Sequence, residues 1–305
     1  MRELRQDPLT GRWVALCDDH VDYRVPTRSF VATEDACPFC PGGAARKASP
    51  LDQVGHAMAW PHQTPILRVE EGSEAVGPGR RPGLGAHEVL VGSERHAAAH
   101  ELSAERGADL MRLAARRLLD LRGDRRLGAQ GWGRRVRPGS HGRDTVSAWP
   151  SLPGSPEPIG RDAVASAVVL ALRDGRELGR VGDVHVWCSL APQRPFEVRL
   201  AWLGSGPADA ALSDLALALR GVERLLASEV GPHGHDACWR AGPPTDAPVL
   251  LTGCVEVAPV TVVDHPPLVG VLPSHAATPE VVAEPLRDRF RAAVCHDADV
   301  VEGER

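Results

Sequence analysis

The sequence predicts an α+β protein built from two similar halves. Segments with the apolar spacing of strands alternate with segments that have the spacing of helices. A weak repeat also relates the halves. Glu88-Val89 lies in a predicted strand 14 residues before Leu102-Ser103 at a helix start, and Glu197-Val198 lies 15 residues before Leu212-Ser213. Two copies of a strand–loop–helix–strand unit fit a duplicated α+β domain, and a chance match is the alternative.

The first half contains one clear strand and one clear helix. Residues 1–65 are typical of short strands and turns, and the Gly/Pro/Glu-rich residues 68–83 are typical of a loop. The apolar run 86–91 predicts a buried strand. Ser103 is suited to cap a helix that reaches about residue 121, where leucines recur at helical spacing. The stretch 124–160 is rich in Gly, Pro, Arg and Ser and is predicted to be irregular.

The second half has more regular patterns. They predict helices over 164–174, 212–228 and 279–289, and strands over 184–190, 196–203 and 249–258. We expect residues 1–158 to form the first half and residues 159–305 the second.

Composition limits the function classes. The net charge of −5 over 305 residues argues against a nucleic-acid partner. No apolar run approaches the 18 residues of a membrane span, and the N-terminus lacks the apolar stretch of a secretory signal. A cytoplasmic protein is therefore expected, in which the seven cysteines serve as thiols or metal ligands rather than in a disulfide framework.

Three N-terminal motifs suggest a family. They are Arg5-Gln-Asp-Pro-Leu-Thr-Gly-Arg-Trp-Val14, then Cys37-Pro-Phe-Cys40-Pro-Gly, and then Gly85-Ala-His-Glu-Val-Leu-Val91 followed by Ser93-Glu-Arg-His96.

 Together the motifs resemble the galactose-1-phosphate uridylyltransferase family of the histidine-triad superfamily. Pro195-Phe-Glu-Val198 and the segment that begins at Pro279 resemble later parts of the same family, in the same order.

The resemblance implies a duplicated histidine-triad-like fold with a large antiparallel sheet and packed helices. It implies a UDP-sugar or another nucleotide as ligand, and a homodimer is one expectation, since members are often dimeric. The sequence alone does not decide whether a dimer forms.

The resemblance also implies a two-step uridylyl transfer through a histidine in a His-Pro-His-x-Gln segment. With Gly142 and Pro150 as anchors, the first histidine's position holds Ser151, the nucleophile's holds Pro153 and the glutamine's holds Ser155. Proline has no side-chain nucleophile. On this alignment the chain is catalytically degenerate.

The second half departs from the family in a similar way. A His-x-His-x-Glu strand of the family, which can hold a second metal, corresponds here to Thr252-Gly-Cys254-Val-Glu256. Both histidines are absent and the glutamate remains.

A zinc site is the chemistry that the chain retains best. The resemblance implies Cys37, Cys40 and His96 as ligands. The family's fourth ligand falls on Ser151, a poor zinc ligand, so His141, Asp144 or water are the alternatives. Two reduced thiols in a Pro-rich turn are the metal-free alternative.

Other candidate residues are weaker. Gly142 and Arg143 are predicted to bind a nucleotide, together with Arg24, which resembles an arginine that the family places in the neighbouring subunit's site. His141 is expected to be a solvated loop histidine, and His185 a structural residue on a strand. His233, His235 and Cys238 have metal-like spacing but are expected to lie in a loop.

Three functions remain open at this point. The first is a degenerate binding or scaffold protein. The second is a repurposed nucleotide or sugar-phosphate enzyme with Arg143, Asp144, His141 and Glu256 in one cleft, which fails if Trp149 and Leu152 fill that cleft. The third is an active UDP-glucose–hexose-1-phosphate uridylyltransferase of galactose metabolism.

Overall fold

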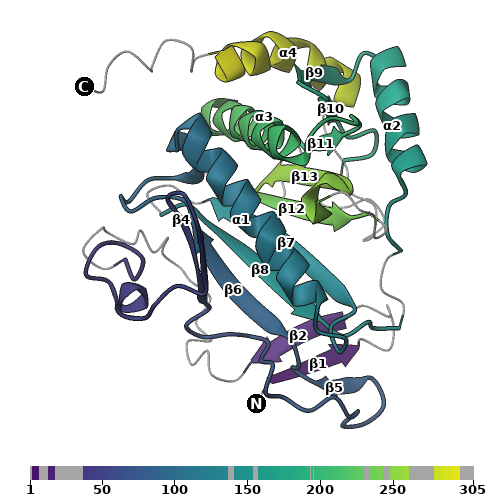
Figure 1. Cartoon of the computed structure of the whole chain (residues 1–305). Coiled ribbons are helices and arrows are strands. Elements are labelled where there is room, and N and C mark those ends of the chain that lie inside the picture. Colours follow the sequence, from purple (N-terminus) through teal and green to yellow (C-terminus); the bar gives the residue numbers. More distant parts are fainter. Residues whose placement is uncertain are drawn as a thin grey trace.

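The structure, a computed structural model, describes residues 2–6, 13–17, 37–136, 141–153, 157–192, 194, 196–229, 234–242, 248–260 and 278–295 (Figure 1). Its strands are β1 (Arg2–Gln6), β2 (Trp13–Cys17), β3 (Asp52–Val54), β4 (Ala57–Pro61), β5 (Arg80–Pro82), β6 (Ala86–Val91), β7 (Ala129–Val136), β8 (Arg143–Trp149), β9 (Glu177–Val181), β10 (Val184–Cys188), β11 (Val198–Trp202), β12 (His235–Ala241) and β13 (Gly253–Pro259). The α-helices are α1 (Ala104–Arg122), α2 (Arg161–Arg173), α3 (Ala208–Glu229) and α4 (Pro279–Cys295), and the 3-10 helices are η2 (Ala44–Lys47), η3 (Ala99–Glu101) and η4 (Val249–Leu251).

One antiparallel sheet of ten strands runs through both halves, in the order β3-β4-β6-β8-β7-β12-β13-β11-β10-β9. The order is symmetric about the β7–β12 pair, because β6, α1, β7 and β8 correspond to β11, α3, β12 and β13. The structure thus confirms the α+β class and the duplication. The boundary predicted at residue 158 falls between β8 and α2, and the halves share one sheet.

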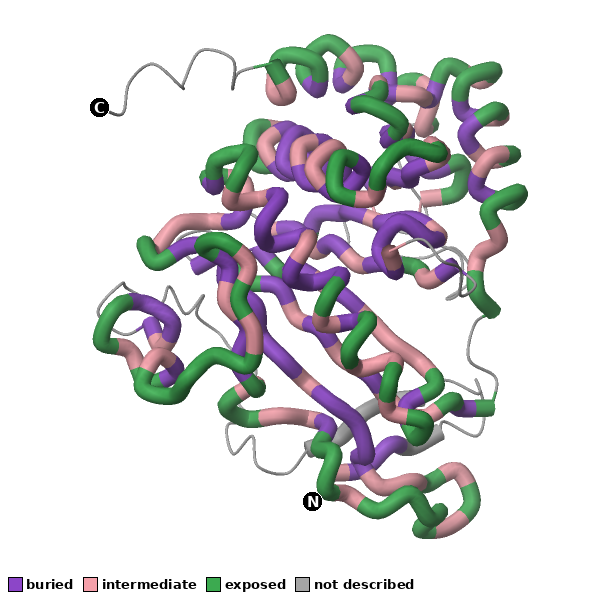
Figure 2. The backbone as a smooth tube through the Cα atoms, in the orientation of Figure 1, coloured by how far each residue is buried: buried purple, intermediate pink, exposed green. Residues whose placement is uncertain are grey.

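Helices α1 and α3 cover one face of this sheet and pack side by side (Figure 1). The predicted leucines Leu110, Leu113 and Leu118 of α1 are fully buried in the main core. The Ser103 side chain accepts a hydrogen bond from the backbone N–H of Arg106 and caps the helix, as expected. In Figure 2 the central strands and the sheet-facing sides of the helices are buried.

The opposite face of the sheet, called the open face below, is covered only in places by the residues that the structure describes. Helix α2 packs there on the second half, where Val164 and Val168 contact Trp187, Ala201 and Cys254. A small sheet in the order β2-β1-β5 lies beside the far end of β8.

Several sequence predictions were wrong in position. The stretch 124–160 contains β7 and β8, and β12 begins at His235, where a loop was expected. Helix α3 begins at Ala208, so Ser213 lies inside it and donates to the carbonyl of Asp209. The strand expected over 249–258 begins as η4. Within the described residues, no helix is both long and apolar enough to cross a membrane.

Candidate functional site

A tight turn presents the two cysteines of the Cys37–Cys40 motif. The N–H of Gly43 donates to the carbonyl of Cys40 at 2.9 Å, and Gly42 has a φ of +82°. A Cβ on Gly43 would lie 2.4 Å from the Pro38 carbonyl oxygen, so only glycine fits there. Both thiols are buried beneath this turn.

Two histidines meet these thiols. His96 follows β6 and lies with Nδ1 3.4 Å from the Cys40 Sγ. His141 immediately precedes β8, and its Nδ1 lies 3.4 Å from the Cys37 Sγ and 3.6 Å from the Cys40 Sγ. All four ligand atoms lie within 4.8 Å of one another. A tetrahedral zinc with usual bond lengths places a sulfur and a nitrogen ligand about 3.6 Å apart, so this spacing suits the ion.

The protonation of His141 also suits a metal. Its Nε2–H donates to the carbonyl of Ser93 at 3.2 Å, which leaves the Nδ1 lone pair directed at the thiols. Burial lowers the pKa of His141 to about 4, and the nearby His96 lowers it further in the same direction. The ring is therefore neutral at pH 7, as a metal ligand must be.

His141 was expected to be solvated, and that expectation was wrong, because its side chain is buried in this cluster. Asp144, another alternative for the fourth ligand position, points to the opposite face of the sheet. There it accepts hydrogen bonds from Arg134 and from the indole N–H of Trp132. The second Arg134 partner is the buried Glu223 of α3. This network fixes β7 and β8 to the second half.

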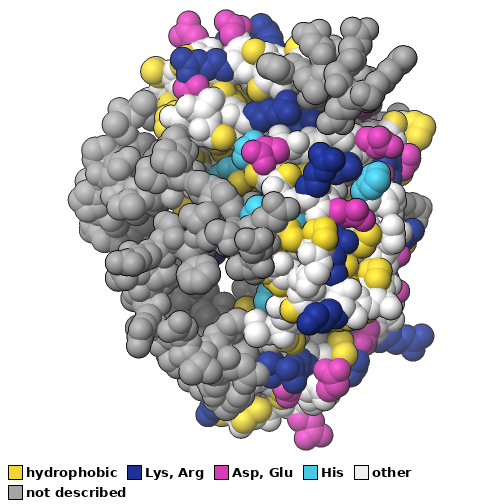
Figure 3. Space-filling view, turned by 90° about the vertical axis from the view of Figure 1, so that its left-hand side faces the viewer, with side chains coloured by type: hydrophobic (Ala, Val, Ile, Leu, Met, Phe, Trp, Pro, Cys, Tyr) yellow, Lys and Arg dark blue, Asp and Glu magenta, His cyan; other side chains and the backbone are white. Residues whose placement is uncertain are grey.

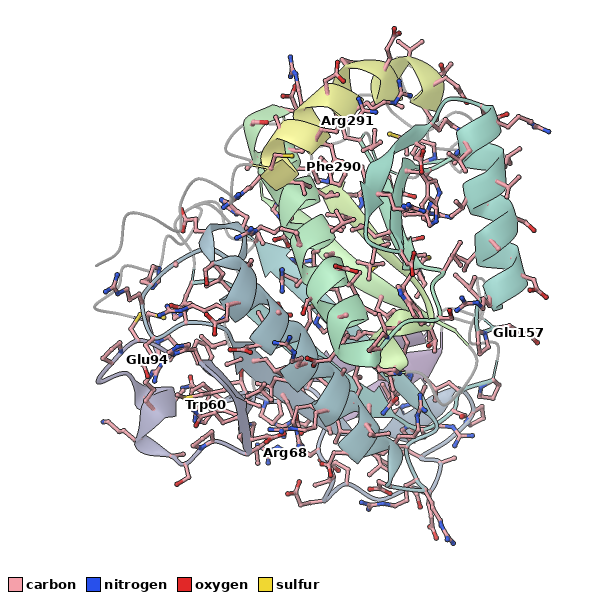
Figure 4. All side chains as sticks on the ribbon, turned by 45° about the horizontal axis from the view of Figure 1, so that its top comes forward. Trp60, Arg68, Glu94, Glu157, Phe290 and Arg291 are labelled. Atoms are coloured by element: carbon pink, nitrogen blue, oxygen red, sulfur yellow. The ribbon has the colours of Figure 1, made fainter. Side chains whose placement is uncertain are left out.

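The cluster borders the start of β8 on the open face. Along β8, Asp144, Val146 and Ala148 are buried toward the helices, and the alternating residues Arg143 and Thr145 face the other side. Arg143 is exposed, and its guanidinium carbon lies 6.0 Å from the centre of the Phe39 ring of the cysteine turn. Figure 4 labels Trp60 and Glu94, which mark this corner of the first half.

Gly142 has a packing role that the structure makes plain. Its N–H donates to the carbonyl of Ala97 at 2.7 Å, and a Cβ there would lie 2.3 Å from the nitrogen of Ala99. Arg24 and Ser155, also predicted as site residues, lie outside the described residues.

Ser151 and Pro153 lie beyond the far end of β8 and are exposed. The seven residues of β8 separate them from the cysteine turn by about 20 Å, at about 3.3 Å per residue. Trp149 and Leu152 pack there with Leu4 and Leu67. The structure therefore does not bring Ser151 to the other three predicted ligands, and it brings His141 there instead.

The remaining candidates are dispersed. His185 lies on β10 with Nδ1 3.5 Å from Glu177, which fits the expected structural role. His235 is buried at the start of β12 on the helix side. Glu256 lies on β13 and Asp144 faces away from Arg143, so the polar cleft expected of a repurposed enzyme is not assembled from these groups.

No family model matches the sequence, and no curated relative matches it. Solved structures do. A structure of uridylyltransferase superposes with a TM-score of 0.68 at 17% identity and covers 96% of this chain and 98% of its own. The chain has the uridylyltransferase fold. An ADP-glucose phosphorylase from Arabidopsis thaliana with bound ADP-glucose shares this fold, with a TM-score of 0.67, 17% identity and coverage of 94% and 99%.

A more distant structure belongs to a DUF4931 family protein from Bacillus cereus. It superposes with a TM-score of 0.53 at 14% identity and covers 79% of this chain and 99% of its own. The uridylyltransferase fold predicted from the N-terminal motifs is thereby confirmed.

Proposed function

We propose that this chain binds a nucleotide, such as a nucleotide sugar, on the open face of β8 and does not form a covalent nucleotidyl intermediate. It is a binding or scaffold protein on the uridylyltransferase fold. The fold supports a nucleotide ligand, because one protein that shares it contains bound ADP-glucose. The residues on β8 support the absence of a covalent step.

The position of His141 carries this proposal. In the family that the sequence resembles, the first histidine of His-Pro-His-x-Gln is a metal ligand and the second is the nucleophile. Because His141 meets Cys37 and Cys40, counting from it places Arg143 at the nucleophile's position and Thr145 at the glutamine's. This alignment replaces the one anchored on Gly142 and Pro150, which assigned those positions to Pro153 and Ser155.

Arginine changes what the position can do. A guanidinium stays protonated at neutral pH and has no nucleophilic lone pair, so it cannot accept a uridylyl group. It binds phosphate oxygens well through its planar set of N–H donors. Arg143 therefore holds a phosphate where the family's histidine would attack one.

Three cysteines of the large sheet, Cys188, Cys238 and Cys254, are poor substitutes for the nucleophile. Burial raises the pKa of Cys254 to about 11 and that of Cys188 to about 12. Burial also raises the pKa of Cys238, with Glu256 contributing to the same shift. These thiols remain protonated at pH 7 and are poor nucleophiles.

We assign a structural role to the proposed zinc. Cys37, Cys40, His96 and His141 would complete a tetrahedral set, which leaves no ligand position for a reactive water. When bound, the ion would fasten the cysteine turn to the ends of β6 and β8. The chain's own residues, chiefly Arg143, would contact the ligand.

Calorimetric titration with UDP-glucose and ADP-glucose, followed by intact-mass measurement, tests the proposal. We expect saturable binding of at least one nucleotide sugar and an unchanged protein mass. Arg143→Ala should weaken binding about tenfold or more, because it removes a charge-assisted phosphate contact. Arg180→Ala, on the edge strand β9, is the matched control and should bind normally. A stable adduct of one UMP or AMP, or no binding of either nucleotide sugar, would refute the proposal.

A further inference from the structure

The backbone of Arg143 is anchored on both sides. Arg143 pairs with Val91 of β6, and the N–H of Gly142 donates to the carbonyl of Ala97 at 2.7 Å. Its side chain, in contrast, is exposed and long. Binding of a phosphate would select one of the many conformations of such a side chain, at a cost in conformational entropy. A contact that already holds the guanidinium in that conformation therefore raises the affinity for the ligand.

An aromatic ring supplies such a contact. The guanidinium carbon of Arg143 lies over the ring of Phe39, 6.0 Å from its centre. This distance is within the range of a cation–π interaction. The N–H donors of a guanidinium lie in its plane, and the attraction of a ring acts through its π face. The ring therefore orients the guanidinium without accepting a hydrogen bond from it.

Phe39 is itself held firmly by the cysteine turn. It lies between Cys37 and Cys40 in the sequence, and it is only 4% exposed. Its carbonyl accepts a hydrogen bond from the Nε of Arg46 at 2.6 Å. The centre of its ring lies 6.3 Å from that of Trp60, in a tilted arrangement. The ring of Phe39 is thus a fixed platform beneath Arg143.

A second arginine of this region has a different environment. The guanidinium carbon of Arg46 lies 5.6 Å from the centre of the Trp60 ring. The side chain of Arg46 is 18% exposed and lies 4.0 Å from Glu94, which Figure 4 labels beside Trp60. Its Nε is bound to the Phe39 carbonyl, so this arginine fastens the turn. Arg143 also lies over an aromatic ring, but it is exposed and a ligand can reach it.

We propose that Phe39 is a positioning residue for Arg143: its ring holds the guanidinium in the orientation that receives a phosphate of the nucleotide. This inference rests on the proposed function, in which Arg143 contacts the ligand. It adds a second task to the cysteine turn. The turn then carries both the thiols of the Cys/His cluster and the ring that orients the ligand-binding arginine.

Calorimetric titration of the full chain with UDP-glucose and ADP-glucose tests the platform. Phe39→Leu keeps an apolar side chain but removes the aromatic face, so the affinity should fall about three- to fivefold. In a chain that already carries Arg143→Ala, the same change should alter the affinity less than twofold, because no guanidinium remains to be held. Met58→Ala is the matched control in the same apolar cluster and should bind normally.

Nuclear magnetic resonance of the ligand-free protein provides a second readout. The ring current of Phe39 shifts the side-chain proton resonances of Arg143 upfield when the guanidinium lies over the ring. These resonances, assigned by their absence in Arg143→Ala, should move downfield in Phe39→Leu. They should keep their position in Met58→Ala, and thermal unfolding checks that each variant is folded.

The outcomes separate this inference from the proposed function. If a nucleotide sugar binds through Arg143 but Phe39→Leu leaves its affinity unchanged, the platform is refuted and the proposed function stands. If neither nucleotide sugar binds, the proposed function fails. A downfield shift of the Arg143 resonances in Phe39→Leu would then still support the platform, and unchanged resonances would overturn it. An equal loss of affinity in Phe39→Leu and Met58→Ala would also overturn it, because ordinary packing would explain both.

Discussion

The Nδ1 atom of His141 lies 3.4 Å from the Sγ atom of Cys37, although 104 residues separate them in the sequence. This contact joins the start of β8 to the cysteine turn. It also determines which residue of β8 stands next to this Cys/His cluster, namely Arg143.

The first prediction concerns metal content. Purified protein should contain one zinc per chain by mass-spectrometric metal analysis. His141→Ala should lose it, because the remaining three residues leave the tetrahedral set open. The unfolding temperature should fall by about 5 °C or more, since binding of a structural zinc contributes directly to folding. His56→Ala, at an exposed turn, should retain the metal. Full zinc occupancy in His141→Ala would count against His141 as a ligand.

A second prediction concerns the geometry of the cysteine turn. Gly43→Ala should lower zinc occupancy, because its Cβ would lie 2.4 Å from the Pro38 oxygen and displace the turn that carries the thiols. Gly72→Ala is the control, since a Cβ there meets nothing within 4 Å. Metal analysis of both variants decides the matter, and equal occupancy would show that the turn tolerates a side chain.

The buried charge network should be sensitive to removal of one partner. Asp144→Ala leaves Arg134 buried without its bidentate carboxylate, and we expect a loss of about 3–5 kcal/mol of unfolding free energy. Asp120→Ala removes an exposed partner of Arg117 and should cost about 1 kcal/mol or less. Urea denaturation measures both variants. A loss for Asp144→Ala as small as that for Asp120→Ala would contradict the role assigned to the network.

The stability of the protein should depend on pH through His100. Burial lowers the pKa of His100, although Glu223 and Glu101 act against that shift. The unfolded chain therefore takes up a proton more readily, and stability should fall as pH drops below the ordinary histidine range. His100→Gln should remove this part of the dependence. Denaturation midpoints at pH 7.5 and 5.5 measure it, and an identical change with pH in both proteins would contradict the prediction.

Much of the fold was predictable because apolar periodicity marks β6, α1 and α3. Strands β7 and β8 were missed for a physical reason. The inward positions of this hairpin include Arg134 and Asp144, which are buried only because they pair with each other and with Glu223. A charged residue at an inward position hides the alternation that identifies a strand.

The candidate site was predictable in part. The Cys37–Cys40 spacing and His96 pointed to the cluster, but His141 was placed in solvent. Its burial depends on the cysteine turn and on the Ser93 carbonyl, which are distant in sequence. A usable signal was present beyond the inward Asp144, since polar and apolar residues alternate over Thr145-Val-Ser-Ala148. On the face that Figure 3 shows, acidic and basic side chains are interspersed among the described residues.

Intact-mass measurement after incubation with UDP-glucose tests the central claim most directly. The comparison is between the natural chain and the double variants Arg143→His/Thr145→Gln and Pro153→His/Ser155→Gln. We predict no UMP adduct on the natural chain or on the Pro153 variant, and a UMP adduct on the Arg143 variant, where the histidine stands beside the Cys37–Cys40–His96–His141 cluster. An adduct on the natural chain, or on the Pro153 variant alone, would contradict the account.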